Sequence, residues 1–200
     1  MGELTQYLNQ ILAWHSRLGT ALRECLSPGL SVTEIRDQIA TVPFKLPAEF
    51  VELYAWRNGT PIHSSKVVSF IEYHRFLPLD EALGRFQMTY PIIREYYGNA
   101  DWMMTFEDGS GDGYGVSAVA EEAREAAPIV LLFEGEGVNT VFHSLTQMMK
   151  TMVACFEAGI FSIGEDGDLH TDFYELGQTV HKLVPDLQYL TLYASYLRPK

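Results

Sequence analysis

The residues best suited to do chemistry lie in one short stretch, FEDGSGDGYGV at positions 106–116, where glycines alternate with acidic and polar residues. Counted from Asp108, the early positions of a calcium-binding EF-hand loop are matched, with Asp112 at position 5 and Gly113 at position 6. Position 12 requires a glutamate but is Val119, and the flanking residues are typical of strands, not helices. The sequence therefore excludes an EF-hand and leaves a looser cation site or a turn.

The same glycines do not form a phosphate-binding loop. Neither GxGxxG followed by a helix nor GxxxxGK is present, and the neighbouring carboxylates would repel an anion. We expect a turn between two strands instead, with positive φ at Gly109, Gly111 and Gly113. In such a turn, Asp108 and Asp112 would accept hydrogen bonds from nearby backbone N–H groups.

A second acidic segment, GEDGDLHTDFYE, covers residues 164–175. Its Asp166, Asp168, His170 and Asp172 stand at alternate positions, so on an extended strand they would share one face and could bind a metal. A solvent-exposed acidic hairpin explains the spacing equally well. The six histidines are scattered, and no nucleophile-elbow, HExxH or reactive-cysteine motif is present. We therefore expect no catalytic residue, no metal and no cofactor.

Charge narrows the class of partner. The 200-residue chain has a formal net charge of −12, of which residues 106–137 hold −7 and residues 157–175 hold −6. Nucleic-acid binding depends on Lys and Arg contacts to phosphates, so this balance argues against DNA or RNA. Acidic surfaces attract basic proteins over long range. A protein partner is the expectation, and plain solubility is the alternative reading.

The spacing of apolar residues and the residues typical of helix ends predict the helices that position these segments. Ser31 precedes Glu34 by three residues, the spacing of a capping box, while Pro47 opens a helix that Asn58-Gly59 ends. The expected helices cover residues 3–26, 31–42, 46–59, 81–94, 142–156 and 176–197, with a break or shortening at Pro91 and an interruption at Pro185.

The expected strands cover residues 67–71, 102–106, 114–119 and 129–133, and the glycine-rich stretch joins the second and third as an antiparallel hairpin. Cys25 and Cys155 lie in apolar helical patterns and are expected as small buried hydrophobic residues in a reducing cytoplasm. The N-terminus lacks signal-peptide features, and no uncharged apolar run approaches the roughly 18 residues of a membrane span.

Three segments in order carry a resemblance to a known family: LPAEFVELYAWRNGT (46–60), WMMTFEDGSGDGYGV (102–116) and FHSLTQMMKTMVACFEAG (142–159). Together they resemble the SUKH superfamily, the Smi/Knr-like proteins, over about residues 30–160. The resemblance implies an α+β fold with a curved antiparallel sheet flanked by helices, and no enzymatic apparatus. It implies one domain over residues 1–200, with helical extensions at both ends.

The resemblance and the charge together imply a non-enzymatic protein-binding module, an immunity protein that neutralises a basic toxin domain of a bacterial contact-dependent or polymorphic toxin system. An intracellular scaffold or regulator of cell-wall synthesis or signalling is the alternative, and a metal-dependent hydrolase is a third reading. Tyr96 and Tyr97 are further exposed aromatic candidates. The expected partner-binding residues are Trp56, Asp108, Asp112, Tyr114, Glu134, Glu136, Asp166 and Asp168. The expected turn-forming residues are Pro47, Asn58, Gly59, Gly109, Gly111 and Gly113.

Overall fold

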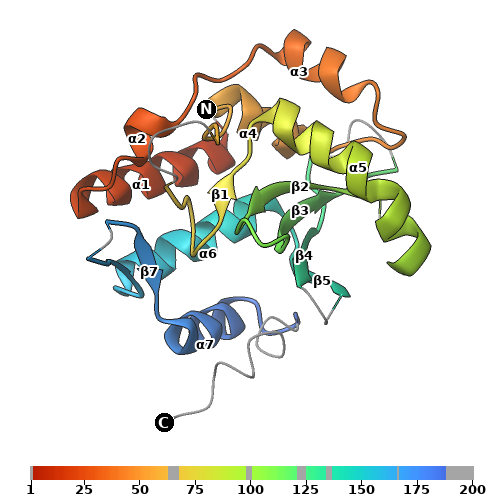
Figure 1. Ribbon diagram of the computed structural model, residues 1–200. Coiled ribbons are helices and arrows are strands. Elements are labelled where there is room, and N and C mark those ends of the chain that lie inside the picture. The colour runs from red at the N-terminus through yellow and green to blue at the C-terminus, as the bar shows by residue number, and fades with distance from the viewer. Residues whose placement is uncertain are drawn as a thin grey trace.

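The structure is a computed structural model that describes residues 2–62, 68–97, 101–120, 125–133, 137–165 and 167–187, except for the side chain of Tyr97. The predicted site residues Glu134, Glu136 and Asp166 lie outside this part of the chain, as does Val67. The described residues form a five-stranded antiparallel sheet in the order β1 to β5, a separate two-stranded hairpin and several helices (Figure 1). The predicted α+β class is confirmed.

In chain order the elements are α1 (Glu3–Leu18), α2 (Leu22–Cys25), α3 (Val32–Ile39), α4 (Ala48–Trp56), β1 (Arg75–Phe76), α5 (Leu79–Tyr97), β2 (Trp102–Glu107), β3 (Gly113–Ser117), β4 (Ile129–Phe133), β5 (Gly137–Phe142), α6 (Leu145–Glu157), β6 (Phe161–Ile163), β7 (Leu169–Thr171) and α7 (Phe173–Leu183).

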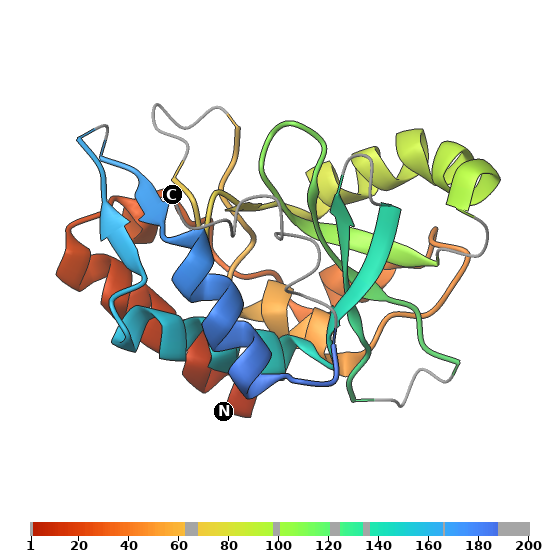
Figure 2. The same cartoon turned by 90° about the horizontal axis from the view of Figure 1, so that it is seen from below.

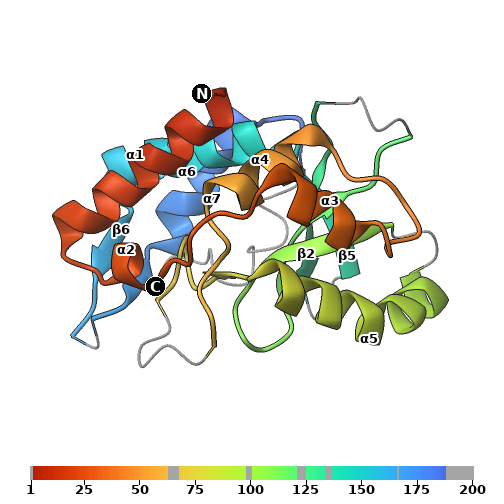
Figure 3. The same cartoon turned by 90° about the horizontal axis from the view of Figure 1, so that it is seen from above.

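The helices lie on both sides of the sheet. α5 packs against β2 on one side, while α1 and α6 pack against each other on the other side (Figures 2 and 3). The methionine stripe of α6 is fully buried at Met148, Met149 and Met152, so its prediction as core filling is confirmed. No helix in the described ranges combines the length and the apolar character that crossing a membrane would require.

The first helix is interrupted, although the sequence predicted one continuous helix over residues 3–26. Gly19 adopts φ +79 and ends α1, with a backbone N–H that donates to the carbonyl of His15. A left-handed glycine is the commonest way to end a helix. The chain then turns at Thr20 before the short helix α2, so Gly19 was a stop signal that the apolar pattern concealed.

The predicted capping box at the start of α3 is confirmed. The Ser31 hydroxyl accepts from the backbone N–H of Glu34 at 3.2 Å, and the Glu34 carboxylate accepts from the backbone N–H of Ser31 at 2.8 Å. The helix ends at Ile39, three residues before the predicted end near Val42. Because a capping box uses only contacts between neighbours in sequence, it can be predicted without the tertiary structure.

The turn residues around α4 lie near their predicted positions. Pro47 was predicted at the first helical position but is the N-cap, one residue before the helix begins at Ala48. Gly59 adopts φ +64, and a β-carbon there would lie 2.3 Å from the backbone nitrogen of Pro78. Asn58 has a role that the sequence did not show, because its side-chain oxygen accepts from the backbone N–H of Leu79 at 2.8 Å, at the start of α5.

The break predicted at Pro91 is wrong, since α5 continues through it to Tyr97. A proline inside a helix removes one backbone hydrogen bond. Here Pro91 is exposed to solvent. The buried side of the helix is held by Phe86 and Tyr90, whose ring centroids lie 5.4 and 6.2 Å from that of Phe44. Packing of this face keeps the segment helical despite the lost hydrogen bond.

The predicted hairpin is confirmed, with β2 and β3 antiparallel and joined by the glycine-rich stretch. Gly109 and Gly111 adopt φ +88 and +118, as expected for turn glycines. The sequence did not predict β1 or β5. Among residues 68–71, where a strand was expected, the pairing is limited to an isolated bridge between Ile71 and His74.

The positive φ predicted for Gly113 is wrong, and its requirement for glycine has another cause. Gly113 lies inside β3, and a β-carbon there would approach the carbonyl oxygen of Phe106 to 2.2 Å. The neighbouring atom belongs to the backbone of the paired strand, so it cannot rotate away. Gly113 is therefore a close-packing position of the sheet.

Replacing Gly113 with valine should lower the free energy of unfolding by about 1–3 kcal/mol, the usual cost of overpacking. Urea denaturation followed by circular dichroism would measure the change. Gly84→Ala is the control and should not lower stability, because a β-carbon at Gly84 has no atom within 4 Å and alanine favours the helix in which it lies. If Gly113→Val unfolds at the same urea concentration as the unmodified protein, the sheet does not need this glycine.

Candidate functional site

A cavity of about 250 Å³ lies beside the turn between β2 and β3. We call it the hairpin cavity. Residues from the turn before β1, the β2–β3 turn, β4 and the start of α7 meet around it, although they are far apart in the sequence. It is lined by Tyr73, His74, Asp108, Ser110, Asp112, Leu131, Phe133 and Phe173.

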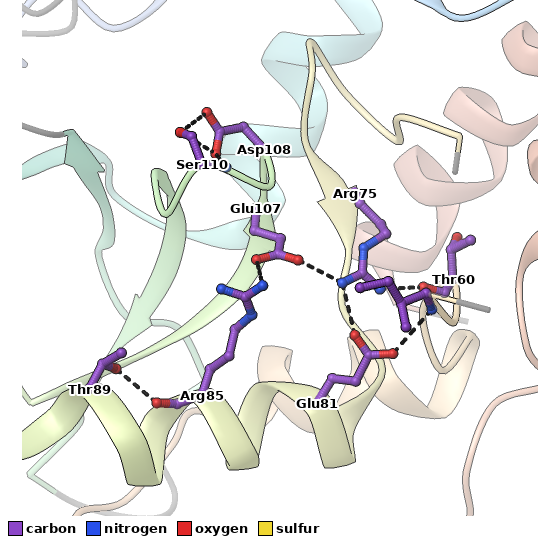
Figure 4. A network of polar contacts seen from close by, with 9 residues as sticks. Thr60, Arg75, Glu81, Arg85, Thr89, Glu107, Asp108 and Ser110 are labelled. Atoms are coloured by element: carbon purple, nitrogen blue, oxygen red, sulfur yellow. Dashed lines mark hydrogen bonds and ion pairs between the residues drawn. The ribbon is translucent and has the colours of Figure 1, made fainter. Parts of the chain in front are cut away.

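The turn itself holds one carboxylate in place. The backbone N–H of Ser110 donates to Asp108 Oδ1 at 2.7 Å, and the Ser110 hydroxyl lies 2.9 and 2.7 Å from the two carboxylate oxygens (Figure 4). The backbone N–H of Asp108 donates to the carbonyl of Asp112 at 3.1 Å and closes the turn. The predicted bonding of Asp108 to a neighbouring N–H is confirmed, and both aspartates line the cavity.

His74 forms a polar part of the cavity wall. It is 5% exposed, and its Nδ1 has no hydrogen-bond partner, although Nδ1 lies 3.5 Å from Glu72 Oε2. Burial lowers the pKa of His74 to about 4, and the negative charge of Asp108 only partly opposes this effect. The ring is therefore neutral at neutral pH. A neutral imidazole keeps one nitrogen as a hydrogen-bond acceptor.

Tyr114 lies behind His74 and not on the surface, so its predicted role as an exposed anchor is wrong. The side chain is fully buried, and its ring centroid is 4.7 Å from that of His74. Its hydroxyl lies 2.8 and 3.0 Å from the two carboxylate oxygens of Glu72, which is also fully buried. A buried carboxylate needs hydrogen-bond donors, and this need draws the tyrosine inward.

Glu72 also has unusual backbone geometry. It is the single residue other than glycine with positive φ in the described ranges, at +50. Such conformations cost about 1–3 kcal/mol and persist where the surroundings impose them. The tight turn before β1 imposes it here, since the backbone N–H of His74 donates to the Ile71 carbonyl at 2.7 Å. This turn brings Tyr73 and His74 to the hairpin cavity.

Trp56 is buried as well, so its predicted exposure is wrong. It is 9% exposed, its Nε1 donates to Asn9 Oδ1 at 2.9 Å, and its ring packs edge-on against Phe70 with centroids 6.0 Å apart. A polar partner on α1 allows the indole N–H to be satisfied inside the protein. The sequence pattern of α4 did not reveal this partner.

The second acidic segment forms a hairpin, as one of its two interpretations predicted, with β6 antiparallel to β7. Its aspartates make different contacts. Asp168 accepts hydrogen bonds from the backbone N–H and hydroxyl of Ser69 at 3.2 and 3.1 Å, while Asp172 caps α7 by accepting from the N–H of Glu175 at 3.1 Å. Within the described ranges, no three His, Cys, Asp or Glu side chains are grouped so as to hold a metal.

A buried ion network lies beneath the hairpin turn (Figure 4). Glu107 is 2% exposed, and its Oε1 accepts from Arg75 at 2.6 Å while its Oε2 lies 2.5 Å from Arg85 Nη2. The Arg85 contact is an ion pair that lacks hydrogen-bond geometry. Arg75 also donates to Glu81 at 2.8 Å and to the carbonyl of Thr60 at 2.6 Å. The network ties β1 and α5 to the end of β2.

α5 carries a row of exposed apolar side chains, which we call the α5 stripe: Met88, Ile92 and Tyr96. They are 77%, 56% and 75% exposed and stand four residues apart, so they share one face of the helix. The predicted exposure of Tyr96 is confirmed. The sequence did not point to Met88 and Ile92, although their spacing was visible, because spacing alone does not show which face of a helix is covered.

No protein-family model matches this sequence, and no curated protein matches it either. The fold and the site thus define an α+β protein with three special features: the hairpin cavity, the buried network beneath its turn and the α5 stripe. None of these features assembles a recognisable set of nucleophile, base and oxyanion donors among the described residues.

Proposed function

We propose that the protein acts by binding another protein and not by catalysis, with the α5 stripe at the centre of the contact. The single observation that carries this proposal is the exposure of three large apolar side chains on one helical face. Single exposed apolar residues are normal on soluble proteins, whereas adjacent ones are typical of interaction sites. Tyr96 suits such a site because tyrosine combines apolar area with a polar hydroxyl.

The charge of the chain favours a basic partner. The net charge of −12 would attract a basic domain and speed its association at low salt. Asp108 and Asp112, which line the hairpin cavity, are among the acidic residues that produce this charge. The partner that we propose is therefore a protein with a basic surface, and the expected contact is an apolar centre with acidic surroundings.

The finer proposal is that this partner is the basic toxin domain of a bacterial contact-dependent or polymorphic toxin system. The protein would then be a cytoplasmic immunity protein of the SUKH, Smi/Knr-like, type, with a single domain and a curved sheet. Its support is the order of the three resembling segments, the antiparallel sheet and the acidic composition. An intracellular scaffold would instead bind a housekeeping partner.

A binding titration against the toxin-like proteins encoded beside the gene tests this proposal. We expect binding that weakens as sodium chloride is raised, and the Ile92→Ser, Tyr96→Ser double variant should lose about tenfold or more in affinity, as for residues at the centre of an interface. Gln87→Ser is the matched control, since Gln87 is exposed on the same helix but outside the α5 stripe.

Two results would count against the proposal. Tight binding that is unaffected by both serine substitutions would show that the α5 stripe is not the contact. Absence of binding to every neighbouring gene product would remove the immunity role. Circular dichroism of each variant would establish that the helix is retained, because both substituted side chains are more than half exposed.

A further inference from the structure

We propose that the hairpin cavity receives the guanidinium group of an arginine side chain from the partner protein. This inference rests on the proposed function, because it assigns the cavity to the same basic partner. It goes beyond that function by naming a second contact, separate from the α5 stripe, and the chemical group that fills it. Four features of the cavity support this inference: its size, its aromatic walls, its carboxylates and its buried imidazole.

The walls of the cavity suit a flat cation. Tyr73 and Phe173 pack together with ring centroids 5.2 Å apart and planes inclined by 42°, and Phe133 contributes a third ring. Aromatic faces attract cations, and arginine is the more frequent partner because its planar guanidinium can also stack. The ammonium of lysine cannot stack in this way. A volume of about 250 Å³ is small for a drug-sized ligand but adequate for one side-chain head group.

The charged side chains among the described lining residues of the cavity are both acidic. Asp108 and Asp112 line it, and among the residues that the structure describes, no lysine or arginine lines it. The contact with Ser110 fixes the Asp108 carboxylate, and a carboxylate has about four lone-pair sites, so it can still accept from a ligand. Arginine presents its N–H groups in a fork that matches a carboxylate.

His74 provides an observation that is independent of the acidic residues. Its side chain is more than nine-tenths buried and lines the cavity, and its Nδ1 makes no hydrogen bond but lies 3.5 Å from Glu72 Oε2. Because Nδ1 faces a carboxylate oxygen, it carries the proton of the neutral ring, and the other ring nitrogen is the acceptor. A guanidinium has five N–H donors and no acceptor. It would therefore complement both the neutral imidazole and the carboxylates.

The alternative of a metal ion is less consistent with the same residues. Within the described part of the chain, no group of three potential metal-binding side chains occurs, and three aromatic rings form part of the cavity wall. Divalent cations prefer several oxygen ligands or imidazoles arranged around one point. Aromatic faces beside carboxylates instead suit an organic cation.

The test is an NMR titration of the full chain, labelled with ¹⁵N, using the peptide acetyl-Gly-Arg-Gly-amide. The matched control peptide replaces arginine with citrulline, which has the same shape but no charge. We expect the arginine peptide to shift the backbone amide signals of Ser110 and Asp112 and the ring nitrogen signals of His74. The citrulline peptide should bind at least about tenfold more weakly, because charged hydrogen bonds are roughly twice as strong as neutral ones.

Substitutions of cavity residues test which side chains contribute to binding. Asp108→Asn retains a side-chain carbonyl that can accept from the Ser110 N–H, so the turn is kept while the charge is lost. Tyr73→Leu removes a ring that is 47% exposed and thus little needed for folding. Each variant should bind the arginine peptide at least about threefold more weakly, which corresponds to the loss of one cation–π contact or one ionic contact. Glu157→Gln, at an exposed acid on α6, should have no effect.

Three results would overturn the inference: equal shifts with both peptides, no shifts around the cavity, or much tighter binding of free arginine than of the peptide. The last would assign the cavity to a small metabolite. These failures are distinguishable from failure of the proposed function. If the partner binds through the α5 stripe while Asp108→Asn and Tyr73→Leu have no effect on its affinity, the cavity inference fails alone.

Discussion

Replacing Glu107 with glutamine should lower the free energy of unfolding by about 3–5 kcal/mol, the usual cost of breaking a buried ion pair by removing one partner. The Glu107 carboxylate lies between Arg75 and Arg85, and the side chain of Arg75 is only 5% exposed. Glutamine has nearly the same size as glutamate but no charge. Less negative charge then remains to offset the hydration that the buried Arg75 guanidinium has lost. Urea denaturation at pH 7 would measure the loss.

The matched control for Glu107→Gln is Glu24→Gln, because Glu24 is exposed on α2. That substitution should change the free energy of unfolding by less than about 0.5 kcal/mol, as for most surface positions. A similar small change at Glu107 would show that Glu81, which also accepts from Arg75, is enough to compensate the buried guanidinium.

The network bears on function because Glu107 directly precedes Asp108. It holds β1 and the first turns of α5 against the end of β2, where the hairpin turn begins (Figure 4). Glu107→Gln should therefore also broaden the NMR signals of the turn residues. Because the ion pair of Arg85 with Glu107 joins α5 to the end of β2, the network connects the helix that carries the α5 stripe to the turn that lines the hairpin cavity.

The stability of the protein should fall between pH 7 and pH 5 by roughly 4 kcal/mol because of two buried histidines, about 2 kcal/mol from each. Burial lowers the pKa of both His15 and His74 to about 4. In the unfolded chain each imidazole has its ordinary pKa of about 6.5, so the unfolded state binds protons first as the pH falls. The stabilisation is complete above pH 6.5 and is lost towards pH 4.

The geometry of His15 explains why its ring stays neutral. One ring nitrogen, Nε2, lies 2.9 Å from the carbonyl oxygen of Phe70, which can only accept, so Nε2 carries the proton. Nδ1 then accepts from the Thr20 hydroxyl at 2.9 Å. Both nitrogens are satisfied without a positive charge, and the backbone bond to Phe70 only partly offsets the effect of burial on the pKa.

Urea denaturation at several pH values between 7 and 5 would check this prediction. His15→Gln and His74→Gln should each make the dependence of stability on pH shallower, whatever they do to stability at pH 7. His181→Gln, at an exposed position on α7, is the matched control for the loss of an imidazole. An unchanged slope in both buried variants would show that other groups cause the acid sensitivity.

Features that depend on neighbouring residues were predicted well. The capping box of Ser31 and Glu34, the left-handed turn at Gly59, and the hairpin with positive φ at Gly109 and Gly111 all appear in the structure. Each involves residues within a few positions of one another, so backbone geometry and short-range hydrogen bonds decide them. The antiparallel hairpin and its Asp108 contact belong to this group.

Errors arose wherever the outcome depended on residues far apart in the chain. Gly113 is required because the backbone at Phe106 passes close to it, and the sequence shows neither that distance nor the ordinary φ of Gly113. Pro91 stays helical because Phe44 holds the opposite side of α5. In both cases the packing of a distant segment outweighed the local preference.

The sequence alone established the presence of both helices and strands, the capped start of α3, the acidic character and the hairpin turn, because composition and local backbone preferences are sufficient for these. It could not show that Trp56 and Tyr114 are buried or that Tyr73, His74 and Phe173 meet at the hairpin cavity. Whether a polar aromatic residue lies inside depends on a distant hydrogen-bond partner, Asn9 for Trp56 and Glu72 for Tyr114. Such partners are brought together only when the chain has folded, so the candidate site belongs to the tertiary structure.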